Sequence, residues 1–248
     1  MKRKTIRVKS RYLGYLLFGL AVLGISCHHI DRDIAEKDFA KYVDQRIGTG
    51  GHGHVFMGAN VPFDVPFGLV QLGPTSIPQT WDWTSGYHIS DTTVIGFSHL
   101  HLSGTGIGDL SDIVLMPTTG PVKHDRGTHD SYDTGMWSYF NRVNEHFAPG
   151  YYATHLNRYN VDVELTATQR VGLHKYTFSE NTNDARVVID LENGTCWDAP
   201  VEGSLMVLND RTIAGYRYSK GWADDQRIYF VLEFSKPFDK FQLHDKNT

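Results

Sequence analysis

The chain has 248 residues, of which 40% are hydrophobic and 12% aromatic, as expected for a folded globular protein with a substantial core. Its formal net charge is −4, and basic residues are scattered after the first dozen positions. These features exclude a largely disordered chain and give no electrostatic footprint for nucleic acid, which we exclude as a partner.

The N-terminus has the pattern of an export signal. Lysines and arginines precede an apolar run over residues 13–25, which is shorter than the roughly 20 residues of a membrane span. The run ends in LGISC (residues 23–27), which resembles a bacterial lipobox, although Gly24 stands where the usual pattern prefers Leu. The resemblance implies a lipoprotein signal peptide over residues 1–26 and lipidation of Cys27. An uncleaved anchor or an ordinary signal peptide are the alternatives.

Lipidation would place the mature protein in a defined compartment. We expect an exported lipoprotein of a Gram-negative bacterium, held to a membrane by its lipid anchor in the periplasm or at the outer membrane or cell surface. Residues 27–38 are polar and are expected to form a tether to the folded body. With Cys27 acylated, Cys196 has no partner for an intramolecular disulfide, and we expect it to be a small buried hydrophobic residue rather than the alternative, a nucleophile.

Residues 39–248 are predicted to form one all-β domain, a large antiparallel β-sandwich. Short apolar runs separated by Gly and Pro favour strands rather than long helices. The alternation in residues 161–167 places Val161, Val163, Leu165 and Ala167 on one face of a strand. The expected strands are residues 67–72, 93–97, 112–116, 159–168, 174–178, 186–191, 204–208, 212–219 and 227–234.

A glycine-rich segment, residues 48–53 (GTGGHG), has the spacing of a dinucleotide-binding fingerprint. That fingerprint needs a helix directly after the glycines, because the helix N-terminus binds the pyrophosphate. Pro62 and Pro66 follow here, and no helix runs through them. The sequence therefore excludes this type of nucleotide site.

Two His-x-His pairs are candidate ligands: His52 with His54, and His99 with His101. A spacing of two places both rings of a pair on one side of a strand. Imidazoles from two strands could bind a transition metal in a cupin-like metalloenzyme, with Asp109 or Asp112 as a carboxylate ligand. Alternatively, these histidines donate hydrogen bonds in a polar cleft.

Residues 81–88 (WDWTSGYH) combine aromatic rings with small polar groups in a loop. Sugars favour such surfaces, because their C–H faces stack on indole rings while carboxylates and imidazoles bind their hydroxyls. The alternative is that one tryptophan belongs to the core and the other caps the surface. The sequence contains no Gly-x-Ser-x-Gly nucleophile elbow, and it does not distinguish a catalytic carboxylate pair from solvated strand faces. We assign no catalytic residue.

These motifs together resemble glycoside hydrolase family 92, the calcium-dependent α-mannosidases of bacteria. The resemblance covers nearly all of residues 42–234. The segments that carry it are VDQRIGTGGHGHVFMG (43–58), PFGLVQL (66–72), WDW (81–83) with SGYH (85–88), IGFSHLHLSGTG (95–106) running to Asp109, PGYY (149–152), VELTATQR (163–170) and HKYTF (174–178).

The family fold is an N-terminal β-sandwich followed by an (α/α)6 barrel, with the active site between them. The resemblance is to the first part only, so we expect the barrel to be absent from this chain. It implies part of an exo-acting enzyme that hydrolyses terminal α-linked mannose, such as α-1,2-linked mannose, from glycans with inversion. It further implies a calcium cofactor, with most calcium ligands and the general acid and base in the barrel, so that this chain by itself is expected to be inactive.

The resemblance implies that the sandwich supplies one wall of the sugar pocket. Thr84 departs from the family pattern, in which a Cys often follows WDW. A different class of function, a non-catalytic carbohydrate-binding lipoprotein, stays open as the alternative. The residues expected to bind substrate are Trp81, Asp82, Trp83, His99, His101, Gly50 and Gly51.

Overall fold

The computed structural model describes residues 38–50, 68–77, 83, 85–102, 108–128, 131 and 134–244. Residues 1–42 and 43–248 form two compact units. In the first unit the described residues contain the short 3-10 helix η1 (Ala40–Tyr42). The expected signal peptide, Cys27 and nearly all of the expected tether lie outside the described residues. None of the described helices has the length and apolar character needed to cross a membrane.

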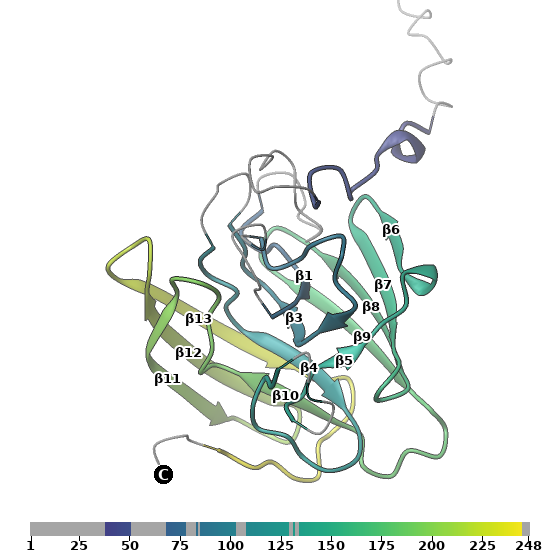
Figure 1. The fold of residues 1–248 in the computed structure, drawn as a ribbon. Coiled ribbons are helices and arrows are strands. Elements are labelled where there is room, and N and C mark those ends of the chain that lie inside the picture. The colour runs from purple at the N-terminus through teal and green to yellow at the C-terminus, as the bar shows by residue number, and fades with distance from the viewer. Residues whose placement is uncertain are drawn as a thin grey trace, which may run out of the picture. The chain divides into compact units, whose positions relative to one another are not determined.

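The regular secondary structure described in the second unit consists of antiparallel strands and one short 3-10 helix (Figure 1). This helix, η3, spans Arg142–Asn144. The strands are β1 (Gly73–Thr75), β2 (Thr93–Val94), β3 (Gly96–Ser98), β4 (Val114–Thr118), β5 (Ser138–Tyr139), β6 (His146–Ala148), β7 (Tyr151–Leu156), β8 (Val161–Ala167), β9 (Gly172–Phe178), β10 (Arg186–Asp190), β11 (Ala199–Val207), β12 (Thr212–Lys220) and β13 (Gln226–Glu233).

The described strands form sheets with the orders β1-β3-β4-β10, β6-β7-β8-β9, β11-β12-β13 and β2-β5. Two of these sheets enclose the main core. Phe97 and Met116 from the first sheet pack in one cluster with Tyr152, Val161 and Leu165 from the second. The burial of β8 alternates along the strand, as predicted, with Val161, Val163, Leu165 and Ala167 turned inward. The all-β sandwich predicted from the sequence is therefore confirmed.

A buried ion cluster joins the sheet β11-β12-β13 to the rest of the sandwich. Arg217 on β12 is fully buried and forms ion pairs with Asp112, which precedes β4, and with Asp198, which precedes β11. Its Nε donates to the carbonyl of Leu191, 2.9 Å away. Because burying a charge is costly without partners, the two carboxylates are what allow an arginine to point into this interior.

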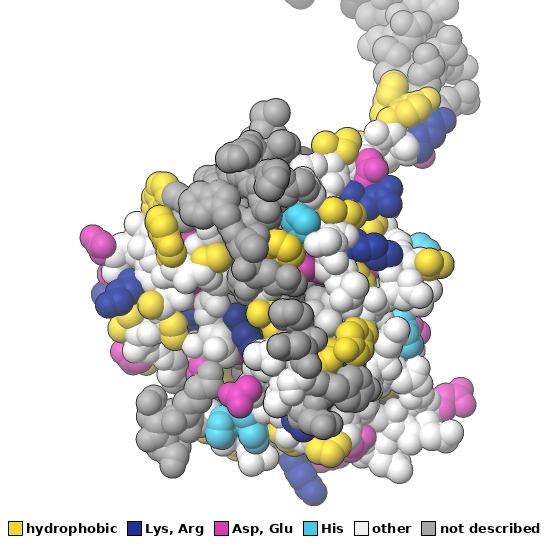
Figure 2. All heavy atoms as spheres, viewed as in Figure 1, with side chains coloured by type: hydrophobic (Ala, Val, Ile, Leu, Met, Phe, Trp, Pro, Cys, Tyr) yellow, Lys and Arg dark blue, Asp and Glu magenta, His cyan; other side chains and the backbone are white. Residues whose placement is uncertain are grey.

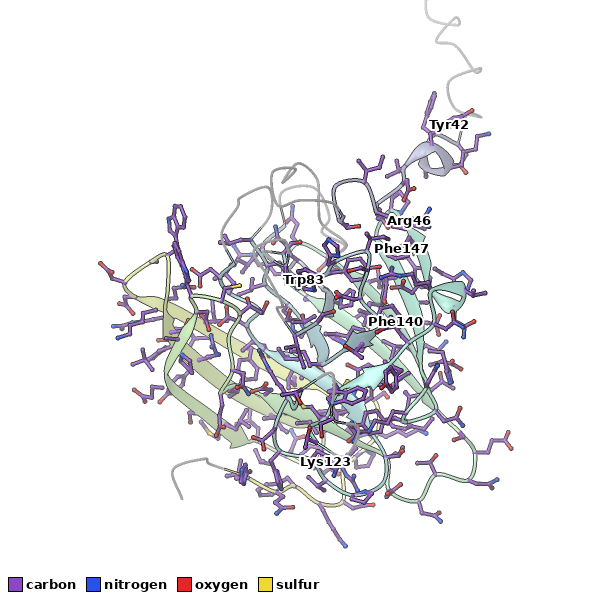
Figure 3. All side chains as sticks on the ribbon, viewed as in Figure 1. Tyr42, Arg46, Trp83, Lys123, Phe140 and Phe147 are labelled. Atoms are coloured by element: carbon purple, nitrogen blue, oxygen red, sulfur yellow. The ribbon has the colours of Figure 1, made fainter. Side chains whose placement is uncertain are left out.

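The face seen in Figure 1 carries both signs of charge. Figure 2 shows Lys and Arg side chains interspersed with Asp and Glu side chains over the described part of this face. Figure 3 shows Arg46 beside Phe147 of β6, where the guanidinium carbon lies 5.9 Å from the ring centroid. That distance is within the range of a cation–π contact.

Two strand predictions needed correction, and three strands were missed. The run at residues 67–72 leads into β1, which begins at Gly73. The run at residues 93–97 divides into β2 and β3, because Gly96 has φ +147, a conformation that L side chains rarely adopt. Strands β5, β6 and β7 were not predicted. In β7 a polar residue, Thr154, points inward, while the aromatic Tyr151 and the apolar Ala153 point outward. The strand therefore lacks the alternation of apolar and polar residues that identifies a strand from sequence.

Candidate functional site

The residues expected to bind substrate divide into two groups. Gly50, Trp83, His99 and His101 lie in the described part of the chain. Gly51, Trp81 and Asp82 lie outside it, as do His52 and His54 of the first His-x-His pair.

Trp83 is anchored from inside the protein. Its side chain is buried, and Nε1 donates to Oδ1 of Asp91 at 2.7 Å. The ring of His88 stacks on the indole with centroids 4.3 Å apart. Asp91 Oδ2 accepts a hydrogen bond from the backbone N–H of His88 at 2.8 Å, and burial raises the pKa of this carboxyl. Trp83, labelled in Figure 3, is therefore a core residue held by Asp91 and His88.

His88 is a residue of this loop that the sequence did not single out. Its Nδ1 accepts a hydrogen bond from the backbone N–H of Ser90 at 3.2 Å, so the proton of the neutral ring is on Nε2. That Nε2 is buried and has no hydrogen-bond partner within the described ranges. Since a buried donor without a partner is costly, this Nε2–H is a candidate donor to a bound ligand.

Gly50 packs directly against the same loop. The backbone N–H of Ile89 donates to the carbonyl of Thr49 at 2.8 Å. A Cβ at Gly50 would lie 2.3 Å from Cγ2 of Ile89, so a larger residue would push the loop away. The structure therefore brings Gly50 next to Ile89, the residue after His88, which is distant from it in the sequence.

His101 holds the other side of this loop. Its Nδ1–H donates to the carbonyl of Ser85 at 2.7 Å, and its Nε2 accepts from the hydroxyl of Ser98 at 2.8 Å. The ring is packed so closely that a Cβ at Gly86 would lie 3.0 Å from Nδ1. Burial lowers the pKa of His101 to about 4, so the ring is neutral at pH 7. With both nitrogens in use, His101 is a positioning residue.

His99 belongs to a different hydrogen-bonded chain. Its Nδ1–H donates to the carbonyl of Ile113 at 2.7 Å, which leaves Nε2 as an acceptor. Nε2–H of His174 donates to it at 3.0 Å, and the hydroxyl of Tyr176 donates to His174 Nδ1 at 2.8 Å. Burial lowers the pKa of both imidazoles. His174 and Tyr176 were not nominated from the sequence, because only the fold brings β9 beside residue 99.

The expectation that His99 and His101 share one side of a strand is wrong. Strand β3 ends at Ser98, so the alternation does not extend through the pair. The two rings contact different partners as a result, one toward Ile113 and one toward Ser85.

The segment opposite these histidines is strained. Leu110, Ser111 and Ile113 have φ values of 66, 62 and 56°, and each such residue costs about 1–2 kcal/mol in this left-handed region. The strand-like pairing of His101 with Leu110 holds the segment in place, together with the hydrogen bond from the backbone N–H of His99 to the Asp112 carbonyl. Strained backbone clusters at functional sites, which makes this turn part of the candidate site.

The described residues do not form a metal centre. Within those ranges, no group of three or more His, Cys, Asp or Glu side chains is placed to hold a metal ion. Asp112 pairs with Arg217, and both oxygens of Asp109 accept hydrogen bonds from Leu110, Trp222 and Gln226. Asp109 and Oδ1 of Asp112 are therefore already occupied, while the buried Oδ2 of Asp112 has no partner among the described residues. The described residues do not provide the roughly six to eight oxygen ligands that calcium takes.

Cys196 is exposed, contrary to the expectation of burial. It has φ +51, in a turn where the neighbouring Thr195 points inward instead. The hydroxyl of Thr195 contacts Ser111 Oγ at 3.1 Å, so the turn supports the strained segment. The prediction failed because it rested on the apolar character of cysteine, whereas the buried residue of this turn is the polar Thr195.

Comparison with known families decides the relationship. Residues 42–248 match the model of the glycosyl hydrolase family 92 N-terminal domain. The chain belongs to glycosyl hydrolase family 92. A curated relative from Arthroderma benhamiae, named an uncharacterized secreted glycosidase, is 26% identical over 196 residues, which cover 73% of this chain and 22% of the relative.

Solved family 92 enzymes share the fold. A family 92 α-mannosidase from Bacteroides thetaiotaomicron, solved in complex with mannoimidazole, is 37% identical with a TM-score of 0.75, covering 82% of this chain and 26% of that one. An inverting family 92 mannosidase from the same organism is 23% identical with a TM-score of 0.61, covering 80% of this chain and 25% of that one. The chain thus spans about a quarter of the length of these enzymes.

Proposed function

We propose that this chain supplies the sandwich wall of the active site in an exo-acting α-mannosidase. The enzyme would remove terminal α-linked mannose, such as α-1,2-linked mannose, from glycans with inversion. The observation that carries the proposal is the 37% identity and 0.75 TM-score to an α-mannosidase solved with mannoimidazole. The general acid, the general base and most of the calcium ligands would come from protein outside this chain.

The proposed substrate contacts are Trp81, Asp82 and the loop that Trp83 anchors. The 2.7 Å hydrogen bond from Trp83 to Asp91 holds this loop to the protein core. A loop held in this way would be ordered before a sugar binds. The Nε2–H of His88, for which the described residues provide no acceptor, would donate to a sugar oxygen. Gly50, Gly51 and His101 would set the position of the loop around the ligand, and His99, which bonds Ile113 and His174, would lie close by.

The buried carboxylates support a catalytic pair from elsewhere. Inverting glycosidases use two carboxyl groups about 6.5–9.5 Å apart, with room for water between them. Asp91 and Glu145 are buried against Trp83 and Tyr152, and Asp112 and Asp198 share Arg217. Each of these carboxylates already serves to hold the fold together.

Release of mannose from α-1,2-mannobiose tests the proposal. The 248-residue chain is assayed alone and with whatever sequence follows it in its gene, each with calcium and with a chelator. We expect calcium-dependent release in the longer form only, with β-mannose as the first product by NMR, and a higher KM for His88→Ala. Release by the short chain alone would contradict the division of catalytic groups. Glycan binding without hydrolysis in both forms would support a carbohydrate-binding lipoprotein instead.

We further propose export as a lipoprotein, for which the curated relative called a secreted glycosidase gives support. Incorporation of labelled fatty acid into the wild type and into Cys27→Ser tests this proposal. Labelling of the wild type alone is expected. Equal labelling of both proteins, or of neither, would contradict lipidation at Cys27.

A further inference from the structure

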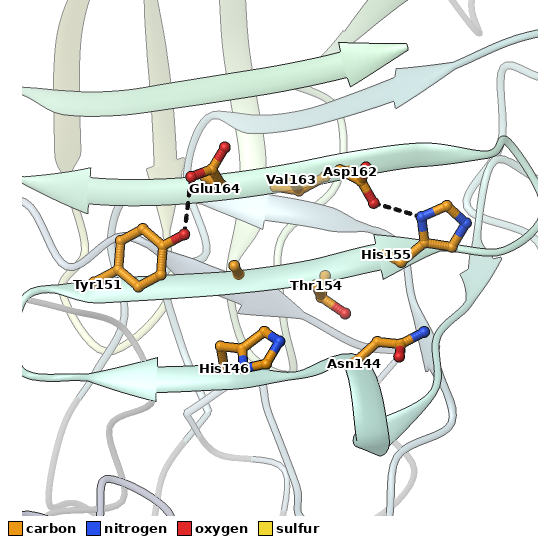
Figure 4. Close-up of a pocket in the computed structure, with 9 residues that line it drawn as sticks. Asn144, His146, Tyr151, Thr154, His155, Asp162, Val163 and Glu164 are labelled. Carbon is orange, nitrogen blue, oxygen red and sulfur yellow. Dashed lines mark hydrogen bonds and ion pairs between the residues drawn. The ribbon is translucent and has the colours of Figure 1, made fainter. Parts of the chain in front are cut away.

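The outer face of the sheet β6-β7-β8-β9 contains a shallow hollow of about 600 Å³ (Figure 4). Three of these strands contribute to its lining. The volume lies within the roughly 300–1,000 Å³ of small-molecule sites. The lining residues are Asn144, His146, Tyr151, Ala153, Thr154, His155, Asp162, Val163 and Glu164.

Strand register explains why the sheet is hollowed here. Ala153 on β7 pairs with His146 on one side and with Glu164 on the other. Tyr151 and His155 flank it on its own strand and, at a spacing of two, point to the same face. A methyl group is thus surrounded by four long polar or aromatic side chains, and the hollow is the volume that a larger residue at position 153 would fill.

The walls of the hollow are held in place by hydrogen bonds. The Tyr151 hydroxyl donates to Glu164 Oε1 at 2.9 Å, and Nδ1–H of His155 donates to Asp162 Oδ1 at 2.6 Å (Figure 4). These contacts reduce the motion of the tyrosine ring and of both carboxylates before any ligand arrives. Because these side chains are already ordered, less conformational entropy is lost when they bind a ligand.

The charges around the hollow are largely compensated. Glu164 also accepts from Nζ of Lys175 at 2.5 Å, which compensates its charge, whereas Asp162 accepts from Nδ1 of His155, which is a charge pair only when the imidazole is protonated. No cluster suited to a metal ion exists in the described ranges. The hollow therefore has at most one uncompensated carboxylate, while it retains several hydrogen-bond donors and acceptors for a neutral polar ligand.

We propose that this hollow is a binding site for one neutral hexopyranose unit of a glycan. The aliphatic face of the sugar would pack on the Tyr151 ring, and its hydroxyls would bind the carboxylates of Glu164 and Asp162 and the imidazole of His146. Alternation in β9 turns His174 and Tyr176 to the opposite face of the sheet from Lys175. The hollow is therefore separate from the His99 chain, and the inference does not rest on the proposed hydrolysis.

Titration of the ¹⁵N-labelled chain with methyl α-D-mannopyranoside tests the site by NMR. We expect the amide signals of residues 146, 153 and 164 to shift together and saturate, with weak affinity. Ala153→Leu fills the floor and should abolish these shifts, while Tyr151→Ala removes the stacking wall and should weaken binding about five- to tenfold. Tyr151→Ala carries the test if Ala153→Leu does not fold. Leu173→Ala, on the same face beyond the hollow, is the matched control and should bind as the wild type does.

Other outcomes would overturn the inference. Glucosamine and glucuronate carry a positive and a negative charge, and either one binding more tightly than the neutral glycoside would contradict the assignment to a neutral sugar. Sugar-dependent shifts that persist unchanged in both hollow variants would place the binding elsewhere. The absence of shifts at these amides up to the solubility limit of the glycoside would show that the hollow binds no hexopyranose.

Discussion

The Nε2 atoms of His99 and His174 lie 3.0 Å apart, with His174 donating and His99 accepting. This contact joins the end of β3 to β9 and so ties together the two sheets that enclose the core. It works only while His99 is neutral, because protonation of His99 at Nε2 would place two donors face to face. In the neutral ring of His101, Nε2 likewise accepts from the hydroxyl of Ser98.

These buried histidines predict a loss of stability in mild acid. Burial lowers the pKa values of His99 and His174, and that of His101 from 6.5 to about 4. The unfolded chain takes up protons below pH 6.5 that the folded chain does not, so the free energy of unfolding falls with pH from 6.5 toward about 4. His101 alone accounts for a loss on the order of 3 kcal/mol across this window.

Urea denaturation as a function of pH, for the wild type and His101→Gln, measures this effect. The variant is expected to be less stable than the wild type above pH 7, because the glutamine does not reproduce both hydrogen bonds, and its free energy of unfolding should depend less on pH below 6.5. Identical slopes for the two proteins below this pH would show that His101 is already protonated in the folded state.

Removing the charge of Arg217 should be among the most damaging substitutions. Arg217→Met would leave Asp112 and Asp198 buried without their cation, and such breaks cost about 3–5 kcal/mol. Arg227→Met on the adjacent strand removes an exposed pair with Asp225 and is the matched control, with no measurable change expected. Thermal and urea denaturation of both variants test this contrast. Equal stability of the two would mean that the buried cluster is dispensable.

Asp91 is predicted to control the order of the Trp83 loop. Asp91→Ala removes the acceptor for the indole N–H and for the backbone N–H of His88, at a cost of about 2–4 kcal/mol. Asp91→Asn keeps one oxygen acceptor and should lose less. Urea denaturation gives the stabilities, and tryptophan fluorescence reports on the loop. Equal losses in the two variants would show that the carboxylate does not act through these hydrogen bonds.

Two glycines with the same φ allow the cost of backbone strain to be distinguished from the cost of a steric clash. Gly127 and Gly150 both have φ +76, so alanine at either position costs about 1–2 kcal/mol of conformational strain. A Cβ at Gly127 would also lie 2.6 Å from the carbonyl oxygen of Thr134, whereas a Cβ at Gly150 meets nothing within 4 Å. Urea denaturation should therefore show a larger loss for Gly127→Ala than for Gly150→Ala. The reverse order would contradict the close approach of the two chain segments at Gly127.

Strand prediction succeeded where one face of a strand is apolar and the other polar. β8 shows this pattern through Val161, Val163 and Leu165, and its position followed from the sequence. β7 did not, because Thr154 points inward while Ala153 lies on the outer face. The hollow around Ala153 follows from the same irregularity, so the feature that hid the strand is also the one that created the candidate sugar site.

The candidate site was predictable in composition but not in arrangement. The WDW and SGYH motifs pointed to a sugar-binding loop, yet the burial of Trp83 against Asp91 depends on how the loop folds back over its own backbone. His174 was invisible as a partner of His99 because 75 residues separate them in the chain.

The sequence alone determined the all-β class, the inward face of β8 and the relationship to family 92, because alternation and motif spacing are local properties of a chain. Tertiary structure alone decided which imidazoles form a hydrogen bond with each other and which aspartates form ion pairs with Arg217. It also decided that Trp83 is buried in the core. Hydrogen bonds and ion pairs form between atoms a few ångströms apart, and the pairing of strands far apart in the sequence sets those distances.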